Sequence, residues 1–419
     1  MFLPLRLAAL LLAVPLLAGD GVVKVKRTFS ADESAELYGT SVSGAGDAND
    51  DGFDDVIIGA PGFSENTGRA VLFDAKREEL LHEFLGENAG DRFGFSVSDA
   101  GDLTSDGFAD VIIGAPGYDE ERGAAYLYDA KKGELIHKLE GEDPGDLFGW
   151  SVSTAGDANN DSFADVIIGA PGVPDKKLGD KAGRAYLYDG KKAKLLQEFK
   201  PKTADEELGW SVANAGDSNG DGFSDVIVGA PGGAEKKKRP ATGIARLYHG
   251  KKGTVLHTFV GVEEGDRFGH SVHGVGDSNS SSFDDVAVAS AAPLGYVIVY
   301  GGKKGEELLR FVSEVEGERF GWSVGGQIDV DGDTFTDIIV GVPGAEDGEN
   351  DQALARVMVF SGKDGELLMN SETTDKSNNW AASVSGAGDI DSDSFGEIIV
   401  GADAHGEKKG RVRILSWDD

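Results

Sequence analysis

Residues 47–55 read DANDDGFDD, and residues 56–61 continue as VIIGAP. The first nine residues are acidic at positions 1, 5 and 9, and the next six begin as a short apolar segment. Later copies of this pattern start at Asp102, Asp157, Asp217, Asp277, Asp329 and Asp389. Seven copies at spacings of 52 to 60 residues indicate a repeat architecture, in which each unit packs on its neighbours.

The second unit shows what one repeat contains. Its strand candidates are residues 93–97, 111–113, 123–128 and 135–139. They alternate in hydrophobicity or are short and apolar, and Gly-rich or acidic turns separate them. Four antiparallel strands per unit and seven units predict an all-β protein, a seven-bladed β-propeller. No unit contains an amphipathic helical stretch, which excludes a helical solenoid.

The two ends of the repeat region predict how the ring closes. The seventh unit stops after its third strand, at residues 410–415, and has no fourth strand. Residues 22–29 align with the fourth strands of other units. We therefore expect residues 22–29 to complete the last blade, which would remove the exposed strand edges of an open ring.

Composition sets the expected compartment. The chain has 419 residues and no cysteine, which excludes a disulfide framework. Its formal net charge of -34 argues against a nucleic-acid partner. Residues 1–19 read as a secretory signal peptide, with Arg6 before the apolar run 7–17, which is too short to span a membrane. We expect residues 20–419 to form a single monomeric propeller that is secreted, extracellular or periplasmic, without a membrane span.

The acidic loops have the residue types that bind calcium, which prefers six to eight oxygen ligands. In the fourth copy, Asp217, Asn219 and Asp221 stand at positions 1, 3 and 5, and Asp225 closes the loop at position 9. An Asp/Asn-rich turn without a metal is the alternative. Repetition of the pattern in every unit favours the metal, so we predict up to seven structural Ca²⁺ ions.

The predicted side-chain ligands occupy positions 1, 3, 5 and 9 of each loop. They are Asp47, Asn49, Asp51 and Asp55; Asp102, Thr104, Asp106 and Asp110; Asp157, Asn159, Asp161 and Asp165; Asp217, Asn219, Asp221 and Asp225; Asp277, Asn279, Ser281 and Asp285; Asp329, Asp331, Asp333 and Asp337; and Asp389, Asp391, Asp393 and Glu397. Loop 5 is expected to be the weakest, because Ser281 replaces a carboxylate and the loop has no glycine. Serine replaces the bend glycine at Ser162, Ser282 and Ser394, which is costly if the bend needs a positive φ.

Two short motifs flank each loop and carry a family resemblance. Phe-Gly occurs at residues 93–94, 148–149, 268–269 and 320–321, and Gly-Ala-Pro at 59–61, 114–116, 169–171 and 229–231. With the acidic loop between them, these motifs resemble the FG-GAP repeat of integrin α-subunit heads. The resemblance covers nearly all of residues 20–419 and implies a seven-bladed propeller with calcium loops on its lower face. Units 1, 4, 5 and 7 depart from one motif or both.

The opposite face is the expected partner surface, because the resemblance implies that partners bind there. Candidate partner-binding residues follow the Phe-Gly position: Phe95, Trp150, Trp210, His270 and Trp322. These rings would crowd the mouth of the central channel and hold a basic side chain of the partner. The alternative is that they only pack adjacent blades together. The long charged loops 174–181, 234–240 and 345–351 would lie on the same face as a binding surface, or would be merely solvated.

We interpret the chain as a calcium-binding adhesion or recognition module for an extracellular protein partner. A propeller lectin that binds glycans is the second hypothesis, and an extracellular enzyme the third. The enzyme is disfavoured because the histidines are scattered and no spacing of a nucleophile and a base stands out. Tyr126 and Tyr186 recur between units, but we expect them to pack blades and not to bind sugar.

Overall fold

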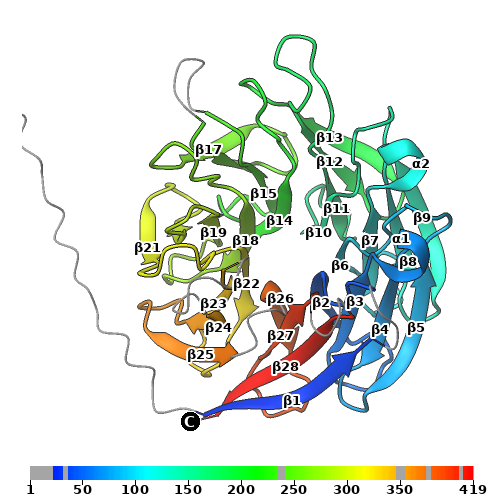
Figure 1. Cartoon of the computed structure of the whole chain (residues 1–419), viewed down its shortest axis with the longest axis vertical. Coiled ribbons are helices and arrows are strands. Elements are labelled where there is room, and N and C mark those ends of the chain that lie inside the picture. Colours follow the sequence, from blue (N-terminus) through cyan, green and yellow to red (C-terminus); the bar gives the residue numbers. More distant parts are fainter. Residues whose placement is uncertain are drawn as a thin grey trace, which may run out of the picture.

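The computed structural model describes residues 22–31, 36–234, 241–345, 354–373, 379–404 and 409–418. These residues form seven four-stranded antiparallel sheets arranged as the blades of a β-propeller (Figure 1). The predicted signal peptide, residues 1–19, lies outside the described residues. Within the described ranges, no helix has the length and apolar character needed to cross a membrane.

The strands follow the repeat order within each blade. Blade 1 contains β2 (Ser41–Gly46), β3 (Asp55–Ala60), β4 (Arg69–Asp74) and β5 (Glu79–Leu85). Blade 2 contains β6 (Ser96–Gly101), β7 (Asp110–Ala115), β8 (Ala124–Asp129) and β9 (Glu134–Glu140). Blade 3 contains β10 (Ser151–Gly156), β11 (Asp165–Ala170), β12 (Arg184–Asp189) and β13 (Lys194–Phe199). Blade 4 contains β14 (Ser211–Gly216), β15 (Asp225–Ala230), β16 (Ile244–Tyr248) and β17 (Val255–Val260).

The remaining three blades keep the same order. Blade 5 contains β18 (Ser271–Gly276), β19 (Asp285–Ser290), β20 (Tyr296–Tyr300) and β21 (Glu307–Val312). Blade 6 contains β22 (Ser323–Ile328), β23 (Asp337–Val342), β24 (Ala355–Phe360) and β25 (Leu367–Thr373). Blade 7 contains β26 (Trp380–Gly388), β27 (Glu397–Ala402), β28 (Arg411–Asp418) and, from the other end of the chain, β1 (Val22–Ser30).

The ring closes as the sequence predicted. Strand β1 pairs antiparallel with β28, from Val22 opposite Asp418 to Ser30 opposite Arg411. Figure 1 shows the blue β1 beside the red β28. The inner strand of blade 7, β26, also contacts the inner strand β2 of blade 1. The prediction that residues 22–29 complete the last blade is confirmed.

The hydrophobic core is divided among the contacts between blades. Seven clusters of buried side chains occur among the described residues, each shared by two adjacent blades. Between blades 1 and 2, for example, Leu72 and Phe84 pack with Val97, Ile113 and Tyr126. The second strand of each blade is covered by neighbouring blades on both faces, so its whole length is buried, as in β7. This burial is why the short segment after each acidic loop is continuously apolar.

The first motif residue is a core side chain. Phe93 is fully buried, and its ring lies edge-on to Tyr126 with centroids 5.1 Å apart. Where the motif departs, Tyr38, Leu208 and Trp380 fill the same place and are also buried. A large apolar side chain is therefore what each inter-blade contact needs. The expectation that Tyr126 packs blades together is confirmed by its burial in this cluster.

A serine near the start of each inner strand links neighbouring blades, a contact that was not predicted. Ser96 Oγ donates a hydrogen bond to the Gly149 carbonyl of the next blade at 3.1 Å, and Ser151 Oγ donates to Gly209 in the same way at 2.9 Å. The equivalent serine of blade 1, Ser41, also acts as an acceptor, because its Oγ accepts a hydrogen bond from Val97 N of blade 2 at 3.0 Å. The signal was available, because Ser-Val recurs at residues 41–42, 96–97, 151–152, 211–212, 271–272, 323–324 and 383–384.

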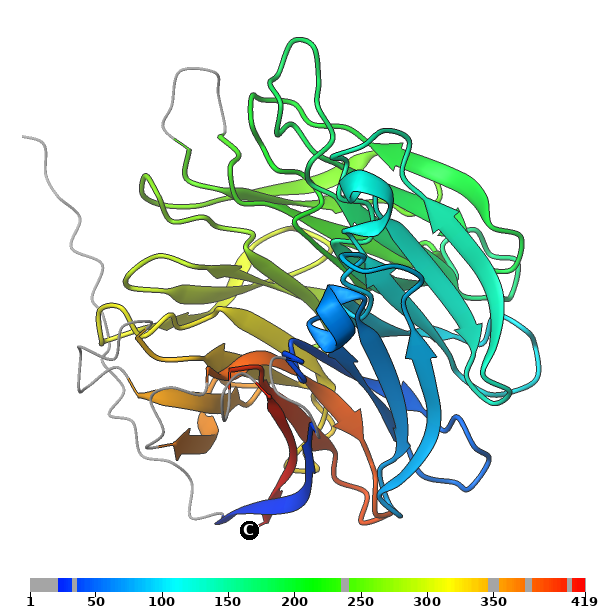
Figure 2. The same ribbon diagram turned by 45° about the vertical axis from the view of Figure 1, so that its right-hand side comes forward.

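Two single-turn helices were not predicted. Helices α1 (Phe63–Asn66) and α2 (Tyr118–Glu121) lie in the loops between the second and third strands of blades 1 and 2. Figures 1 and 2 place both on the same face of the ring. Four residues are too few to show helical periodicity, and both turns contain left-handed residues such as Ser64, with φ 47°.

Candidate metal loops and partner face

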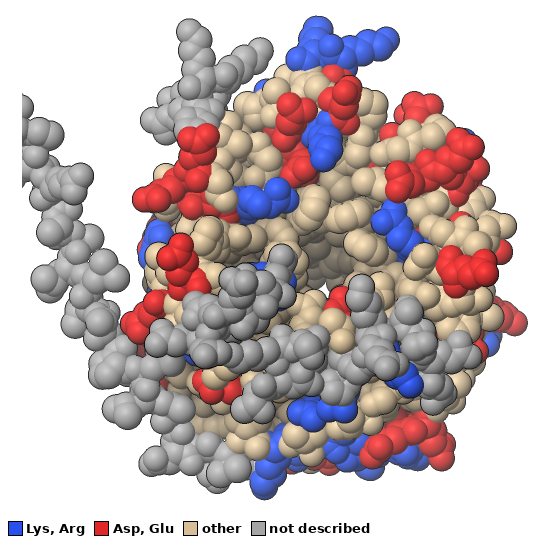
Figure 3. Space-filling model, in the orientation of Figure 1, with Lys and Arg blue, Asp and Glu red and all other residues tan. Residues whose placement is uncertain are grey.

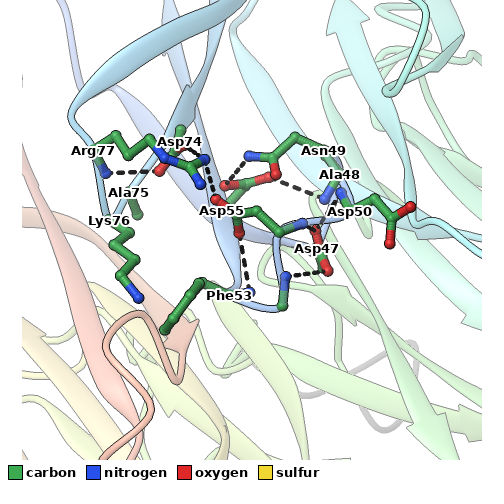
Figure 4. A network of polar contacts seen from close by, with 12 residues as sticks. Asp47, Ala48, Asn49, Asp50, Phe53, Asp55, Asp74, Ala75, Lys76 and Arg77 are labelled. Carbon is green, nitrogen blue, oxygen red and sulfur yellow. Dashed lines mark hydrogen bonds and ion pairs between the residues drawn. The ribbon is translucent and has the colours of Figure 1, made fainter.

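Loop 1 illustrates how the acidic side chains fold inward. The Asp47 carboxylate accepts hydrogen bonds from the backbone amides of Asp50 at 2.7 Å and Gly52 at 2.9 Å. The Asp55 carboxylate is fully buried and accepts bonds from Ala48 N at 3.0 Å and Asn49 Nδ2 at 3.3 Å. Figure 4 shows these side chains gathered inside the turn. The turn thus brings positions 1, 3 and 9 together.

The same turn recurs in all seven loops among the described residues. The position-1 carboxylate accepts a bond from the backbone amide at position 6 in each loop, at 2.7 to 3.0 Å. Position 6 has a positive φ throughout, so Ser162 (φ 71°), Ser282 (φ 67°) and Ser394 (φ 71°) are strained as anticipated. Thr334 (φ 76°) is also strained, although it was not among the predicted positions. A β-branched residue is the least favourable of these choices.

Unpartnered oxygens show that the loops fit a cation. The predicted ligand atoms Asn49 Oδ1, Thr104 Oγ1, Asp391 Oδ1 and Glu397 Oε1 are buried and have no hydrogen-bond partner among the described residues. Buried oxygens of this kind are costly unless something pairs with them. The site in loop 6 also brings together carboxylate oxygens of Asp329, Asp331 and Asp333 within 4.8 Å of one another. This oxygen-rich donor set suits a hard divalent cation.

Loop 7 brings three acidic side chains together in the same way. Carboxylate oxygens of Asp389, Asp391 and Glu397 lie within 4.8 Å of one another. Glu397 therefore reaches the other acidic groups of its loop, as a predicted ligand must. Its Oε2 also accepts the backbone amide of Ile390 at 3.0 Å.

Burial raises the pKa of the carboxyl groups at position 9 in the metal-free fold. Burial, reinforced by neighbouring carboxylates, raises the pKa of Asp55, Asp110 and Asp165 to about 7. The same causes raise the pKa of Asp337 and Glu397 to about 8. A bound cation would supply the positive charge that these groups lack.

Basic residues from the hairpin between the third and fourth strands border loops 1 to 6, a feature that was not predicted. In blade 1, Arg77 pairs with both Asp51 and Asp74, and Lys76 lies over the Phe53 ring at 2.8 Å from its centroid (Figure 4). In blade 3, Lys192 Nζ lies 2.7 Å from Asp161 Oδ2. The signal was the pair of basic residues at 76–77, 131–132, 191–192, 251–252 and 303–304.

Loop 5 differs from its neighbours at position 5. The Ser281 amide donates to Asp277 Oδ1 at 2.8 Å, so the turn itself is preserved. The Ser281 hydroxyl donates to the Phe283 carbonyl of its own loop at 3.4 Å. Position 5 therefore offers no carboxylate, which is consistent with the prediction that this loop is the weakest.

The five candidate partner-binding rings form one continuous arc. Ring centroids are 4.6 Å apart for Phe95 and Trp150, 5.0 Å for Trp150 and Trp210, 5.8 Å for Trp210 and His270, and 4.6 Å for His270 and Trp322. Each ring precedes an inner strand whose other end leads into an acidic loop, so the arc lies on the opposite face from the loops. All five side chains are half-buried.

Charge and solvent access vary along this arc. Arg267 lies over the Trp210 ring at 5.0 Å and Arg319 over the Trp322 ring at 5.1 Å. Burial, with Arg267 nearby, lowers the pKa of His270 to about 4, so this ring is neutral at physiological pH. The face seen in Figure 3 is hollowed at its middle, and uncharged residues border most of the hollow.

The long charged loops are described only in part. In loop 174–181, Asp175 and Gly179 form an antiparallel bridge, and the Asp175 carboxylate accepts the amide of Lys177 at 2.9 Å. Residues 235–240 and 346–351 of the other two predicted loops lie outside the described residues. The expectation that these charged loops form a binding surface therefore stays a prediction.

Comparison with known proteins agrees with this geometry. A family model described as FG-GAP repeat matches residues 38–73, 93–128, 148–188 and 208–248, which are blades 1 to 4 up to the third strand. Over 192 residues the chain is 34% identical to integrin alpha-4 of Xenopus laevis, covering 42% of this chain and 18% of the relative. Over 210 residues it is 32% identical to integrin alpha-6 of Gallus gallus, covering 47% of this chain and 19% of the relative.

A third relative is integrin alpha-PS5 of Drosophila melanogaster, which is 36% identical over 195 residues, covering 42% of this chain and 19% of that protein. The chain thus spans about a fifth of the length of the curated relatives it matches. Four matched repeats, the inter-blade role of their motifs and the closed ring of seven blades agree with one another. The chain is a seven-bladed propeller whose first four blades match the FG-GAP repeat and which is similar to integrin α-subunits.

Proposed function

We propose that this protein is an extracellular, calcium-binding adhesion or recognition module, and not an enzyme. Its partner, an extracellular protein, binds the face opposite the acidic loops. The observation that carries this proposal is the continuous arc of five half-buried aromatic rings at the start of the inner strands. The similarity to integrin α-subunits supports the same reading.

Calcium in this proposal has a structural role. The loops offer carboxylates and amide oxygens, several of them buried without partners, and these are the ligands that Ca²⁺ prefers. Each loop joins the first and second strands of a blade, so a bound ion would hold together the two innermost strands of that blade. Ca²⁺ would also offset part of the net charge of -34.

The aromatic arc suits a basic or apolar side chain of the partner. An aromatic face attracts an ammonium or guanidinium group, and clustered aromatic residues are frequent anchors of protein interfaces. Arg267 and Arg319 already lie over two of the rings, which demonstrates that guanidinium groups fit against this arc. The acidic charge of the chain favours the approach of a basic partner.

The test is a binding screen of the mature protein against immobilised extracellular proteins and free glycans, in Ca²⁺ and in EDTA. A triple variant with Trp150, Trp210 and Trp322 changed to Leu should lose protein binding. A matched control, Phe395→Leu, changes an exposed aromatic residue on the acidic-loop face and should bind normally. Unchanged binding by the triple variant would refute the role of the arc. Binding of free sugar alone would favour the lectin instead.

A further inference from the structure

One histidine breaks the pattern that surrounds the acidic loops. The residue at the end of the third strand is Asp74 in blade 1, Asp129 in blade 2 and Asp189 in blade 3, and each is buried. In blade 4 the equivalent residue is His249, which is only 3% exposed. The position lies beside the loop, where the first three blades place a carboxylate and the fourth an imidazole.

In blades 1 to 3 this aspartate has a clear structural task. Asp74 Oδ1 accepts the backbone amide of Arg77 at 2.7 Å, and its other oxygen pairs with the same arginine side chain. The Asp189 carboxylate likewise accepts the backbone amide and the side-chain ammonium of Lys192, each at 2.8 Å. An imidazole does not reproduce this arrangement, so His249 requires another explanation.

His249 instead faces two predicted ligands of loop 4. Its Nε2 lies 2.9 Å from Asp221 Oδ2, at position 5, and its Nδ1 lies 3.7 Å from Asp225 Oδ1, at position 9. Neither ring nitrogen makes a hydrogen bond of acceptable geometry to any described residue. A buried imidazole without hydrogen bonds that contacts two carboxylates of a cation-binding loop is well placed to become a ligand.

From this placement we propose that loop 4 is a mixed nitrogen and oxygen site that binds a transition-metal ion of the Zn²⁺ class in preference to Ca²⁺. His249, Asp217, Asp221 and Asp225 would hold the ion. The inference rests on the proposed function, because it assumes that the acidic loops bind divalent cations. Ca²⁺ takes oxygen ligands, whereas imidazole nitrogen suits Zn²⁺ and its neighbours in the first transition series. The other six loops have no histidine at the equivalent position.

The site is tested on the full chain by native mass spectrometry, with an excess of Ca²⁺ and increasing Zn²⁺. Wild-type protein should retain one Zn²⁺ ion while Ca²⁺ occupies other loops. His249→Asp restores the residue of blades 1 to 3 and should weaken Zn²⁺ binding at least about tenfold, since even outer-sphere partners of a metal ligand contribute that much. His257→Gln, at a half-buried histidine of the same blade whose Nε2 lies beside the Lys303 carbonyl, is the control and should retain Zn²⁺.

A second probe keeps the test independent of folding defects. Co²⁺ in place of Zn²⁺ should give a visible absorption band in wild type that His249→Gln changes, while the melting temperature in Ca²⁺ stays within a few degrees. Equal Zn²⁺ retention by wild type and both His249 variants would overturn the proposal, as would a failure of wild type to retain Zn²⁺. The mass spectrum distinguishes bound Ca²⁺ from bound Zn²⁺ by mass. The absence of Ca²⁺ from every loop would therefore refute the calcium proposal without deciding the zinc proposal.

Discussion

Gly59 of blade 1 packs directly on Gly94 of blade 2, so that a Cβ atom at Gly59 would lie 2.0 Å from the Gly94 carbonyl oxygen. Gly114 meets Gly149 in the same way, and Gly401 of blade 7 meets Gly39 of blade 1, both at 2.1 Å. The glycine of Gly-Ala-Pro in one blade and the glycine of Phe-Gly in the next are thus two halves of a single contact. The motif is therefore a signature of how repeats join.

Gly94→Ala should strongly destabilise the protein. Gly94 has φ +82°, and a Cβ there would lie 2.2 Å from the Arg69 carbonyl. We expect a loss of roughly 2–5 kcal/mol in the free energy of unfolding, from left-handed strain and overpacking. Gly90→Ala is the control, because Gly90 has φ +91° but open space around it. It should cost only about 1 kcal/mol. Urea denaturation measures both, and equal losses would contradict the contact.

Asp55→Asn should abolish the stabilisation that loop 1 derives from calcium. The change removes the buried position-9 carboxylate but keeps its shape. For a site with a dissociation constant near 10⁻⁴–10⁻³ M, the loss at a few millimolar Ca²⁺ is about 0.5–2 kcal/mol. The measurement is the difference in unfolding free energy between Ca²⁺ and EDTA. Asp50→Asn, on an exposed side chain of the same loop, should leave that difference intact.

The stabilisation by calcium should grow with pH. The pKa of Asp337 and of Glu397 is raised to about 8 in the metal-free fold, from ordinary values of 3.8 and 4.5. The folded state then binds more protons than the unfolded state, so the contribution of these groups is complete below about pH 4 and is lost as pH rises through 8. Ca²⁺ competes with those protons.

The corresponding measurement is the melting temperature in Ca²⁺ and in EDTA from pH 5.5 to 8.5. In EDTA it should fall as pH rises, and the gap between the two curves should widen. A gap that is the same at pH 5.5 and pH 8.5 would show that these carboxylates are not involved in cation binding.

Loop 5 should gain affinity when its missing carboxylate is restored. Ser281→Asp supplies the position-5 ligand, and Ser282→Gly relieves the positive φ of 67°. We expect the double variant to bind one more Ca²⁺ ion, or to bind it about tenfold more tightly, by calorimetric titration. Ser280→Asp in the same loop adds equal charge at position 4, which is not a ligand position, and should not produce this gain.

Most of the fold could be predicted because the assignment of each short segment to a strand or a loop could be checked in seven copies. A single segment such as residues 56–61 is too short to identify a buried strand, but seven aligned copies establish the strand order and the loop positions. The packing of Tyr126 between blades was expected because its position recurs between units. Single-turn helices such as α1 could not be predicted, because among the described residues they interrupt the repeat in two blades and not in every unit.

The candidate sites were predictable to a lesser degree. Positions 1, 3, 5 and 9 of the loops were visible as a pattern of oxygen donors, and so was the list of aromatic residues after Phe-Gly. The contacts of Arg77 with Asp51 and of His249 with Asp221 were not visible, because these partners are separated by 26 and 28 residues in the chain and come from different hairpins. The Ser96 bridge to Gly149 joins two blades and was missed for the same reason.

The sequence by itself determined the number of blades, the closure of the ring by residues 22–29 and the chemistry of the acidic loops. These properties depend on local spacing and residue type, which a repeat displays directly. Only the tertiary structure decided that Phe95, Trp150, Trp210, His270 and Trp322 form one arc, and that an imidazole faces loop 4. Such relationships depend on the angle between adjacent blades and on side-chain burial, which arise when distant segments pack together.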